Sequence, residues 1–210
     1  MKEQIAQIEA GKALPLVEEF YTIQGEGFHT GKAAYFIRIG GCDIGCRWCD
    51  SKITWSAAMH GAKSIEDIVH KVLATPAKSV VVTGGEPTLY NLNPLTSLLK
   101  KHQVKTFLET SGAYDISGDW DWICLSPKTN KHPKLSSLSK ANELKVIIYN
   151  FEEDIAWAEL QARKVTNDCK LYLQPEWSRF KKNIDDIVNY VKTNPQWELS
   201  LQSHKFAGVP

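Results

Sequence analysis

The sequence has no long apolar run and no excess of charge of either sign. Its apolar segments stay well short of the ~20 residues that a membrane-spanning helix needs, and its first residues are mixed polar. We therefore expect neither a membrane span nor a signal peptide, and a cytoplasmic location. The 25 basic and 24 acidic residues give a formal net charge of +1, so there is no electrostatic case for a nucleic-acid partner.

Cysteine is scarce, and its distribution argues against a disulfide framework. The chain has five cysteines, an odd number, and three of them fall between residues 42 and 49. Such an odd and clustered set is typical of a protein in a reducing compartment. Cys124 and Cys169 stand alone, where a free cysteine is most often a small buried hydrophobe. Internal repeats and low-complexity segments are also lacking.

The order of the predicted elements indicates an α/β fold. The length of 210 residues and the 43% hydrophobic content suit one domain, residues 1–210. A helix is expected after Ser64, with Ser64 as its N-cap and Asp67 as the capping-box partner. Residues 1–15 are expected to be a polar lead-in, and residues 128–138 a long loop. The predicted strands cover residues 16–23, 34–39, 79–83, 104–109, 122–125, 143–149, 171–174 and 197–201, with further helices at 94–102, 152–163 and 183–191.

Polar clusters follow six of these strands. They lie at residues 42–51, 84–86, 109–112, 126–128, 174–177 and 202–204. Strands that alternate with helices form parallel β/α units, whose functional residues gather at the carboxyl ends of the strands. Fewer than eight such units fit into this length, so we expect a partial, open TIM-like β/α barrel with its site at one rim.

The spacing of Cys42, Cys46 and Cys49 indicates a metal site directly after a predicted strand. Thiolates bind zinc, copper(I) and iron–sulfur clusters, and a structural zinc site normally has four protein ligands. Three thiolates on a [4Fe–4S] cluster would leave one iron open to an outside ligand, whereas electron-transfer clusters use four. The alternative from another class is a zinc-binding structural module, completed by Asp43, Asp50 or His29.

The cysteine motif, with Trp48 before its last cysteine, resembles the signature of the radical S-adenosylmethionine (SAM) enzymes. The segment T-G-G-E-P at residues 83–87 follows a predicted strand and is similar to the segment that meets the SAM amino group in those enzymes. The resemblance implies a [4Fe–4S] cluster held by Cys42, Cys46 and Cys49, with SAM on the open iron. It also implies a small electron carrier, flavodoxin or ferredoxin, as reductant.

Segments along the whole chain resemble one family of radical SAM enzymes, the 7-carboxy-7-deazaguanine synthases. They are I-Q-G-E-G at residues 23–27, Arg38, E-T-S-G at 109–112, S-P-K at 126–128 and L-Q-S-H-K at 201–205. The resemblance implies a homodimeric carbon–nitrogen lyase of queuosine or deazapurine biosynthesis. Such a lyase converts 6-carboxy-5,6,7,8-tetrahydropterin to 7-carboxy-7-deazaguanine with loss of ammonia and uses SAM catalytically. The alternative is a glycyl-radical-enzyme activase. Its substrate is a protein, so Arg38 and residues 24–27 would then have no evident function.

The resemblance also implies the ligand-binding residues. Expected at SAM are Trp48, Cys49, Asp50, Gly85, Glu109, Ser126, Pro127, Lys128, Gln174, Pro175, Glu176 and Trp177. Expected at the pterin are Ile23, Gln24, Gly25, Glu26, Arg38, Thr83 and Pro210, where the chain is expected to fold back over the substrate. Ser51 is expected to ligate Mg²⁺, which prefers oxygen ligands. An arginine fork suits the substrate carboxylate on chemical grounds.

Several of these residues have structural alternatives. Arg38 would be a surface residue in an ion pair, Glu26 an ordinary turn carboxylate and Ser51 a helix cap. Pro127 and Pro175 would only end strands, and Trp177 would belong to the core. His204 is expected either in the site or as a rim histidine.

Overall fold

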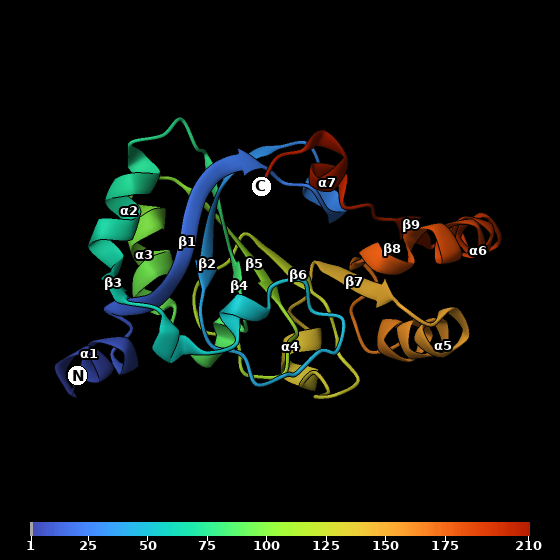
Figure 1. The fold of residues 1–210 in the computed structure, drawn as a ribbon, viewed down its shortest axis with the longest axis horizontal. Helices are drawn as coiled ribbons and strands as arrows, with labels where there is room; N and C mark the ends of the chain where they lie inside the picture. Colours follow the sequence, from blue (N-terminus) through green and yellow to red (C-terminus); the bar gives the residue numbers. More distant parts are fainter. Residues whose placement is uncertain (1) are drawn as a thin grey trace.

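A continuous open sheet of nine strands forms the centre of the computed structural model, which describes residues 2–210 (Figure 1). Its strand order is β3-β1-β2-β4-β5-β6-β7-β8-β9. β1 runs antiparallel to β2 and β3, and every other neighbouring pair is parallel. Since β3 and β9 are unpaired edges, the barrel is open, as the sequence predicts.

The elements alternate along the chain as β/α units. The strands are β1 (Ala13–Ile23), β2 (Ala33–Ile39), β3 (Ala62–Ser64), β4 (Ser79–Gly84), β5 (Lys105–Thr110), β6 (Trp122–Leu125), β7 (Glu143–Ile148), β8 (Lys170–Pro175) and β9 (Trp197–Leu199). The helices are α1 (Lys2–Glu9), α2 (Ile65–Leu73), α3 (Asn93–Lys101), α4 (Leu135–Leu138), α5 (Phe151–Ala162), α6 (Phe180–Thr193) and α7 (Ser203–Ala207). Short 3₁₀ helices are η1 (Gly27–His29), η2 (Lys52–Thr54), η3 (Ala57–Met59), η4 (Pro87–Leu89) and η5 (Trp177–Arg179).

The expected polar lead-in over residues 1–15 is wrong. The structure has α1 there, and β1 already begins at Ala13. Leu14 is fully buried, and Pro15 pairs with Ala62 of β3. This pairing partner is a three-residue strand that no local pattern marks, so tertiary contacts decide the start of β1. The predicted loop 128–138 likewise contains the one-turn helix α4.

Helices cover the sheet at its two ends. In Figure 1, α2 and α3 lie together beside β1, and α5 and α6 lie at the opposite end, near β7 to β9. Ser64 caps α2 as predicted, because its Oγ accepts a hydrogen bond from the backbone N–H of Asp67 at 3.1 Å. Buried side chains form one group around Ile37, Ile68 and Leu108 and a second around Leu144 and Trp197. Of the helices in residues 2–210, none has both the length and the apolar character to cross a membrane.

Alternation along β5 links the core to the concave side of the sheet. Leu108 is fully buried in the core, and the next residue, Glu109, faces a cavity on the other side. This follows from the two-residue period of a strand. Neighbouring strands also end at the same level, since Ile39 pairs with Gly84, and Thr110 with Leu125. The polar segments that follow the strands therefore meet at one rim.

We expect Leu108→Ala to lower the free energy of unfolding by about 2–5 kcal/mol, because it removes buried methyl groups and leaves a cavity. Chemical denaturation followed by circular dichroism measures this change. Leu135→Ala is the matched control, since Leu135 is 69% exposed. Equal unfolding free energies for the two variants would contradict the assignment of Leu108 to the core.

Candidate active site

A cavity of about 290 Å³ lies at the carboxyl ends of the strands. Its wall comes from the ends of β1, β2 and β4 to β8, the cysteine loop after β2, and α7. Every residue that the sequence predicts as part of the site lines this cavity except Pro127, which is buried beside it at the end of β6. His204 also lines the cavity. One hollow therefore collects segments from nearly the whole chain.

The three clustered cysteines share this cavity as free thiols. Cys42, Cys46 and Cys49 are partly buried, and no cysteine within residues 2–210 is in a disulfide. The loop is held in place through its backbone, since Gly41 and Cys42 donate to the carbonyl oxygens of Thr54 and Trp55 at 2.6 and 3.0 Å. Burial raises the pKa of the Cys42 and Cys46 thiols, which favours the neutral form in the free protein. Three free thiols around one hollow fit an iron–sulfur cluster, which binds them as thiolates.

The residues of the zinc alternative do not come together. Across residues 2–210, no three His, Cys, Asp or Glu side chains converge on a position for one metal ion. Asp43 is paired with Lys131 at 2.7 Å and with Tyr114. His29 stacks on Phe107 with ring centroids 4.3 Å apart. A cubane cluster attaches each thiolate to a different iron and does not require convergence on one point.

The segment after β4 packs directly against the cysteine loop. The backbone N–H of Gly85 donates to Ile39, and that of Glu86 donates to Gly41, both at 2.8 Å. A Cβ atom at Gly85 would overlap the carbonyl oxygen of Gly41 and lie 3.0 Å from the Cβ of Cys42. Only glycine allows this approach, so Gly85 sets the distance between the sheet and Cys42.

Glu86 fastens the same segment to the end of β5. Its side chain is 1% exposed. One carboxylate oxygen accepts from Thr88 Oγ1 at 2.7 Å and Thr110 Oγ1 at 2.5 Å. The other accepts from the backbone N–H of Ser111 at 2.8 Å and from the Ser111 hydroxyl. A buried carboxylate with so many donors is fully satisfied, and it joins two strand ends at the cavity wall.

The wall near Cys46 carries a partly buried ammonium. Lys128 Nζ donates to the carbonyl oxygen and the hydroxyl of Ser126 at 2.7 and 2.6 Å, and it lies 5.5 Å from the centre of the Trp48 ring. Burial lowers the pKa of Lys128, while the nearby Cys46 thiolate works to raise it. The cation and the open cavity beside it can accept an anionic group of a ligand.

Trp177 and Glu176, both expected at SAM, differ in how free their side chains are to contact a ligand. Trp177 is 40% exposed and lines the cavity, so it is not a core residue. Its ring meets Phe206 edge-on, with centroids 5.2 Å apart. The carboxylate of Glu176 caps η5, because it accepts from the backbone N–H groups of Ser178 and Arg179 at 3.1 and 3.2 Å. Much of its hydrogen-bonding capacity is therefore used within the chain.

The turn after β1 lies against α7, although the two are far apart in sequence (Figure 1). The backbone N–H and hydroxyl of Ser203 donate to the carbonyl oxygen of Gly25 at 2.9 and 3.0 Å. A Cβ atom at Gly25 would overlap the ring of His204. Burial lowers the pKa of His204. The helix therefore closes one side of the cavity, and His204 lies in the wall on that side.

Arg38 forms an ion pair and also reaches the cavity. Its Nε pairs with Glu18 Oε1 at 2.6 Å, and its Nη1 lies 3.4 Å from Ser51 Oγ. The side chain also lines the cavity. Ser51 stands at the N-cap position of η2, but its hydroxyl makes no capping hydrogen bond and lies 3.3 Å from Asp50 Oδ1. Arg38 is therefore both an ion-pair partner and part of the cavity wall, and Ser51 is not a helix cap.

Lys145 is not among the predicted site residues, yet it lies at the centre of a charged network in the wall. Its Nζ is 2.6 Å from Glu26 Oε2 and 3.0 Å from Glu109 Oε2. Burial works to raise the pKa of Glu26, but the charge of Lys145 and hydrogen bonds from Lys145 and Gln202 lower it to about 2. Glu26 is thus no free turn carboxylate. The signal in the sequence is a lysine within the otherwise apolar run L-K-V-I-I of β7.

An open β/α barrel whose strand ends surround three free cysteines defines a radical SAM protein. The family model of the Radical SAM superfamily matches residues 36–125, which include the cysteine loop, the glycine segment after β4 and all of β5.

Relatives along the whole chain identify the family. A 7-carboxy-7-deazaguanine synthase from Flavobacterium psychrophilum is 52% identical over 100% of this chain and 99% of the relative. One from Synechocystis is 46% identical over 93% of each chain. The crystal structure of QueE from Escherichia coli has 32% identity and a TM-score of 0.81, over 96% of this chain and 99% of that one. This chain belongs to the 7-carboxy-7-deazaguanine synthase family. The relatives support that interpretation of the sequence, and not the activase alternative.

We expect Gly85→Ala to lower the cluster content of the protein, because the added methyl group must push the cysteine loop away from β4. Iron and sulfide analysis after anaerobic reconstitution, with the visible absorbance of the cluster, measures this loss. Gly61→Ala is the matched control, since a Cβ atom there has no neighbour within 4 Å. Full iron content together with wild-type SAM binding in Gly85→Ala would show that the contact with Gly41 is not needed.

Proposed function

We propose that this chain converts 6-carboxy-5,6,7,8-tetrahydropterin to 7-carboxy-7-deazaguanine with loss of ammonia, as a radical SAM carbon–nitrogen lyase that uses SAM catalytically. The observation that supports it is one cavity lined both by the three cysteines and by the turn at residues 23–26 and Arg38. Membership of the 7-carboxy-7-deazaguanine synthase family gives the reaction.

The chain's part is to hold two ligands in register and to keep water away from them. The cluster and SAM, when bound, supply the removal of a hydrogen atom from the substrate. Cys42, Cys46 and Cys49 would each hold one iron of the cluster. Lys128 would meet the carboxylate of SAM and Glu109 its ribose hydroxyls, since their charges and positions on the wall suit these groups.

The remaining SAM contacts come from the segment after β8 and from the cysteine loop. Trp177 is partly exposed at the rim and lines the cavity, which suits contact with the adenine. Gln174 and Pro175 end β8 at the cavity. For Glu176, whose carboxylate caps η5, we propose contact through its backbone. The other residues proposed at SAM are Trp48, Asp50, Gly85 and Ser126.

The pterin would bind on the side of the turn after β1. Glu26 is ionised at neutral pH, since its pKa is about 2, and so it can accept hydrogen bonds from the amino-pyrimidine edge of a pterin. Arg38 offers a planar fork to the substrate carboxylate. Ile23, Gln24, Gly25, Thr83 and Pro210 complete this side of the cavity.

We place Mg²⁺ at the hydroxyl of Ser51. The Ser51 Oγ lines the cavity within reach of Asp50 and of the substrate side of the wall. Mg²⁺ takes six oxygen ligands and keeps several waters, so one hydroxyl with substrate oxygens is a sufficient attachment. The neighbouring Arg38 guanidinium repels a cation, and the negative charge of the substrate carboxylate would offset that repulsion.

The reaction needs an electron from outside the chain, and we propose a small acidic carrier such as flavodoxin or ferredoxin. Arg47 lies exposed within the cysteine loop. Its guanidinium and that of Arg179 both lie over the ring of Tyr149, 5.3 and 4.6 Å from the ring centre. Positive charge beside the cluster loop suits an acidic partner. We also propose a homodimer, on the basis of the family alone.

The test of this function is an anaerobic assay of the reconstituted protein with SAM, a strong reductant, Mg²⁺ and the pterin. We expect the deazapurine and ammonia to form without net loss of SAM, as followed by mass spectrometry. Cleavage of SAM to 5′-deoxyadenosine with the pterin untouched would agree with a radical SAM enzyme but contradict the pterin as its substrate.

We expect Ser51→Ala to raise the Mg²⁺ concentration needed for half-maximal activity about tenfold or more, because one oxygen ligand is lost. Turnover measured across a Mg²⁺ titration gives this constant. Ser56→Ala is the matched control, since Ser56 is exposed and does not line the cavity. An unchanged Mg²⁺ requirement in Ser51→Ala would place the ion elsewhere.

A further inference from the structure

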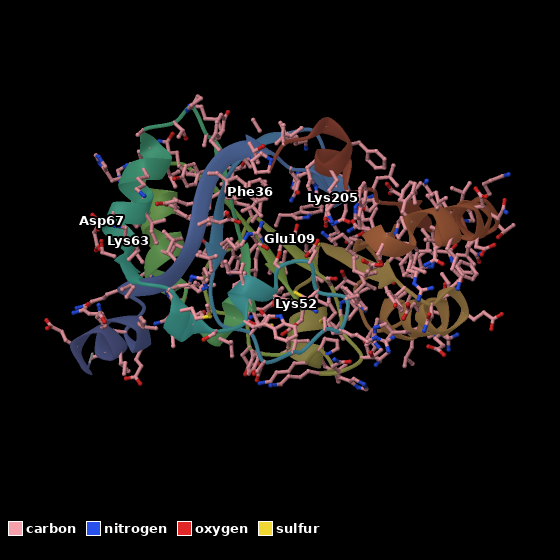
Figure 2. All side chains as sticks on the ribbon, viewed as in Figure 1. Phe36, Lys52, Lys63, Asp67, Glu109 and Lys205 are labelled. Atoms are coloured by element: carbon pink, nitrogen blue, oxygen red, sulfur yellow. The ribbon has the colours of Figure 1, made fainter. Side chains whose placement is uncertain are left out.

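Lys145 is an ion buried in the wall between the two proposed ligand subsites. It points from the middle of β7 to the concave side of the sheet, and its side chain is 4% exposed. Its ammonium contacts Glu26, which follows β1, at 2.6 Å and Glu109, near the end of β5, at 3.0 Å. Glu109 lies near the middle of the view in Figure 2, below Phe36 of β2 and Lys205 of α7.

The side-chain amides of Gln24 and Gln202 also hydrogen-bond to these two carboxylates. Gln24 Nε2 donates to Glu109 Oε1 at 3.2 Å, and Gln202 Nε2 donates to Glu26 Oε1 at 2.8 Å. An ionised carboxylate has about four acceptor positions. Gln174 also hydrogen-bonds to Glu26, and Cys124 to Glu109, so each carboxylate uses much of this capacity within the chain and keeps the remainder for a ligand in the cavity.

Stability does not explain an ammonium at this position. A buried ion pair loses hydration that its attraction barely repays, and apolar residues of similar size are often as good or better. The flanking residues of β7, Leu144 and Val146, are buried in the apolar core on the other face. A charge at residue 145 is therefore better explained by what it does to Glu26 and Glu109 at the cavity.

We propose that Lys145 is a positioning residue shared by both subsites: its one ammonium contacts Glu26 and Glu109 together and fixes the two carboxylates relative to each other, one for the pterin and one for SAM. This inference rests on the proposed function. Lys145 touches neither reacting atom, and it acts through the two glutamates.

Charge around Glu26 supports this role. Lys145 is the nearest cation, and its own pKa is raised well above the usual range by the surrounding negative charges despite its burial. The other charged or titratable groups near this pair are Glu109 of β5, Glu143 of β7 and Cys124 of β6, which act on Lys145. His204 of α7 interacts with Glu26 and also with Asp50 and Lys205. Without Lys145, two carboxylates would share a poorly hydrated wall, which raises the pKa of one of them.

The test compares Lys145→Met and Lys145→Arg in the reconstituted holoenzyme. We expect Lys145→Met to raise the KM for the pterin and the Kd for SAM on the order of 30-fold each, the usual effect of removing one partner of a buried charge pair. Lys145→Arg should restore part of both, because it keeps the charge. Lys100→Met is the matched control, since Lys100 also bridges two carboxylates, Asp119 and Asp121, but on the surface.

A pH profile separates positioning from a structural role. In the wild type the Glu26 carboxyl is ionised at every working pH. In Lys145→Met a carboxyl with a raised pKa takes up a proton as the pH falls, and a protonated Glu26 accepts fewer hydrogen bonds. Pterin affinity of this variant should therefore improve as the pH rises across roughly 5 to 8. His204 is present in both proteins, so the wild-type pH profile shows its contribution. The difference between the two profiles then belongs to the carboxyls.

Each outcome decides something different. Unchanged KM and Kd in Lys145→Met, whatever its melting temperature, would overturn the proposal for Lys145 alone. Absence of pterin turnover by the wild type would instead count against the proposed function. If Lys145→Met does not fold, Lys145→Met/Glu109→Gln, which removes one charge of each sign, is compared with Glu109→Gln. Identical pterin affinities and pH profiles in these two would also overturn the proposal.

Discussion

The close contact between the end of β4 and the cysteine loop is the constraint on which the rest of the site depends. Gly85 and Glu86 donate backbone hydrogen bonds to Ile39 and Gly41, with no side chain between the two segments. This contact fixes the cysteine loop to the parallel sheet, and the sheet in turn fixes the other strand ends. The distance from the three thiols to every other wall of the cavity follows from it.

Hydrogen bonds and ion pairs of buried charged side chains then connect the strand ends, which the sheet by itself only places close together. Glu86 links the segment after β4 to Thr110 and Ser111 at the end of β5. Lys145 of β7 links Glu26, in the turn after β1, to Glu109 of β5. Buried polar networks are costly when any member lacks a partner, so they favour one arrangement of the wall over nearby alternatives. An open barrel, which lacks the mutual support of a closed one, obtains part of its rigidity at the site in this way.

Residues predicted from local sequence segments reach the cavity with one exception. The cysteine loop, the glycine segment and the S-P-K segment each lie in one short stretch directly after a strand, and parallel strands bring such stretches to one rim. Pro127 is the exception, because it is buried next to the cavity and not part of its wall. The prediction of a polar lead-in over residues 1–15 was wrong because it rested on local pattern alone. Leu14 belongs to β1, which pairs with β3 about fifty residues further along the chain, and no local pattern reveals that partner.

The sequence by itself determined the class of the protein, because the cysteine spacing, the alternation of strands and helices and the glycines after β4 are all local patterns with a direct chemical meaning. Only the tertiary structure decided how the site is charged. Lys145 lies 119 residues from Glu26 and 36 from Glu109 in the chain, and nothing local shows that one ammonium meets both. Such contacts depend on the register of distant strands, so the fixed places of these two carboxylates at the cavity emerge only from the folded chain.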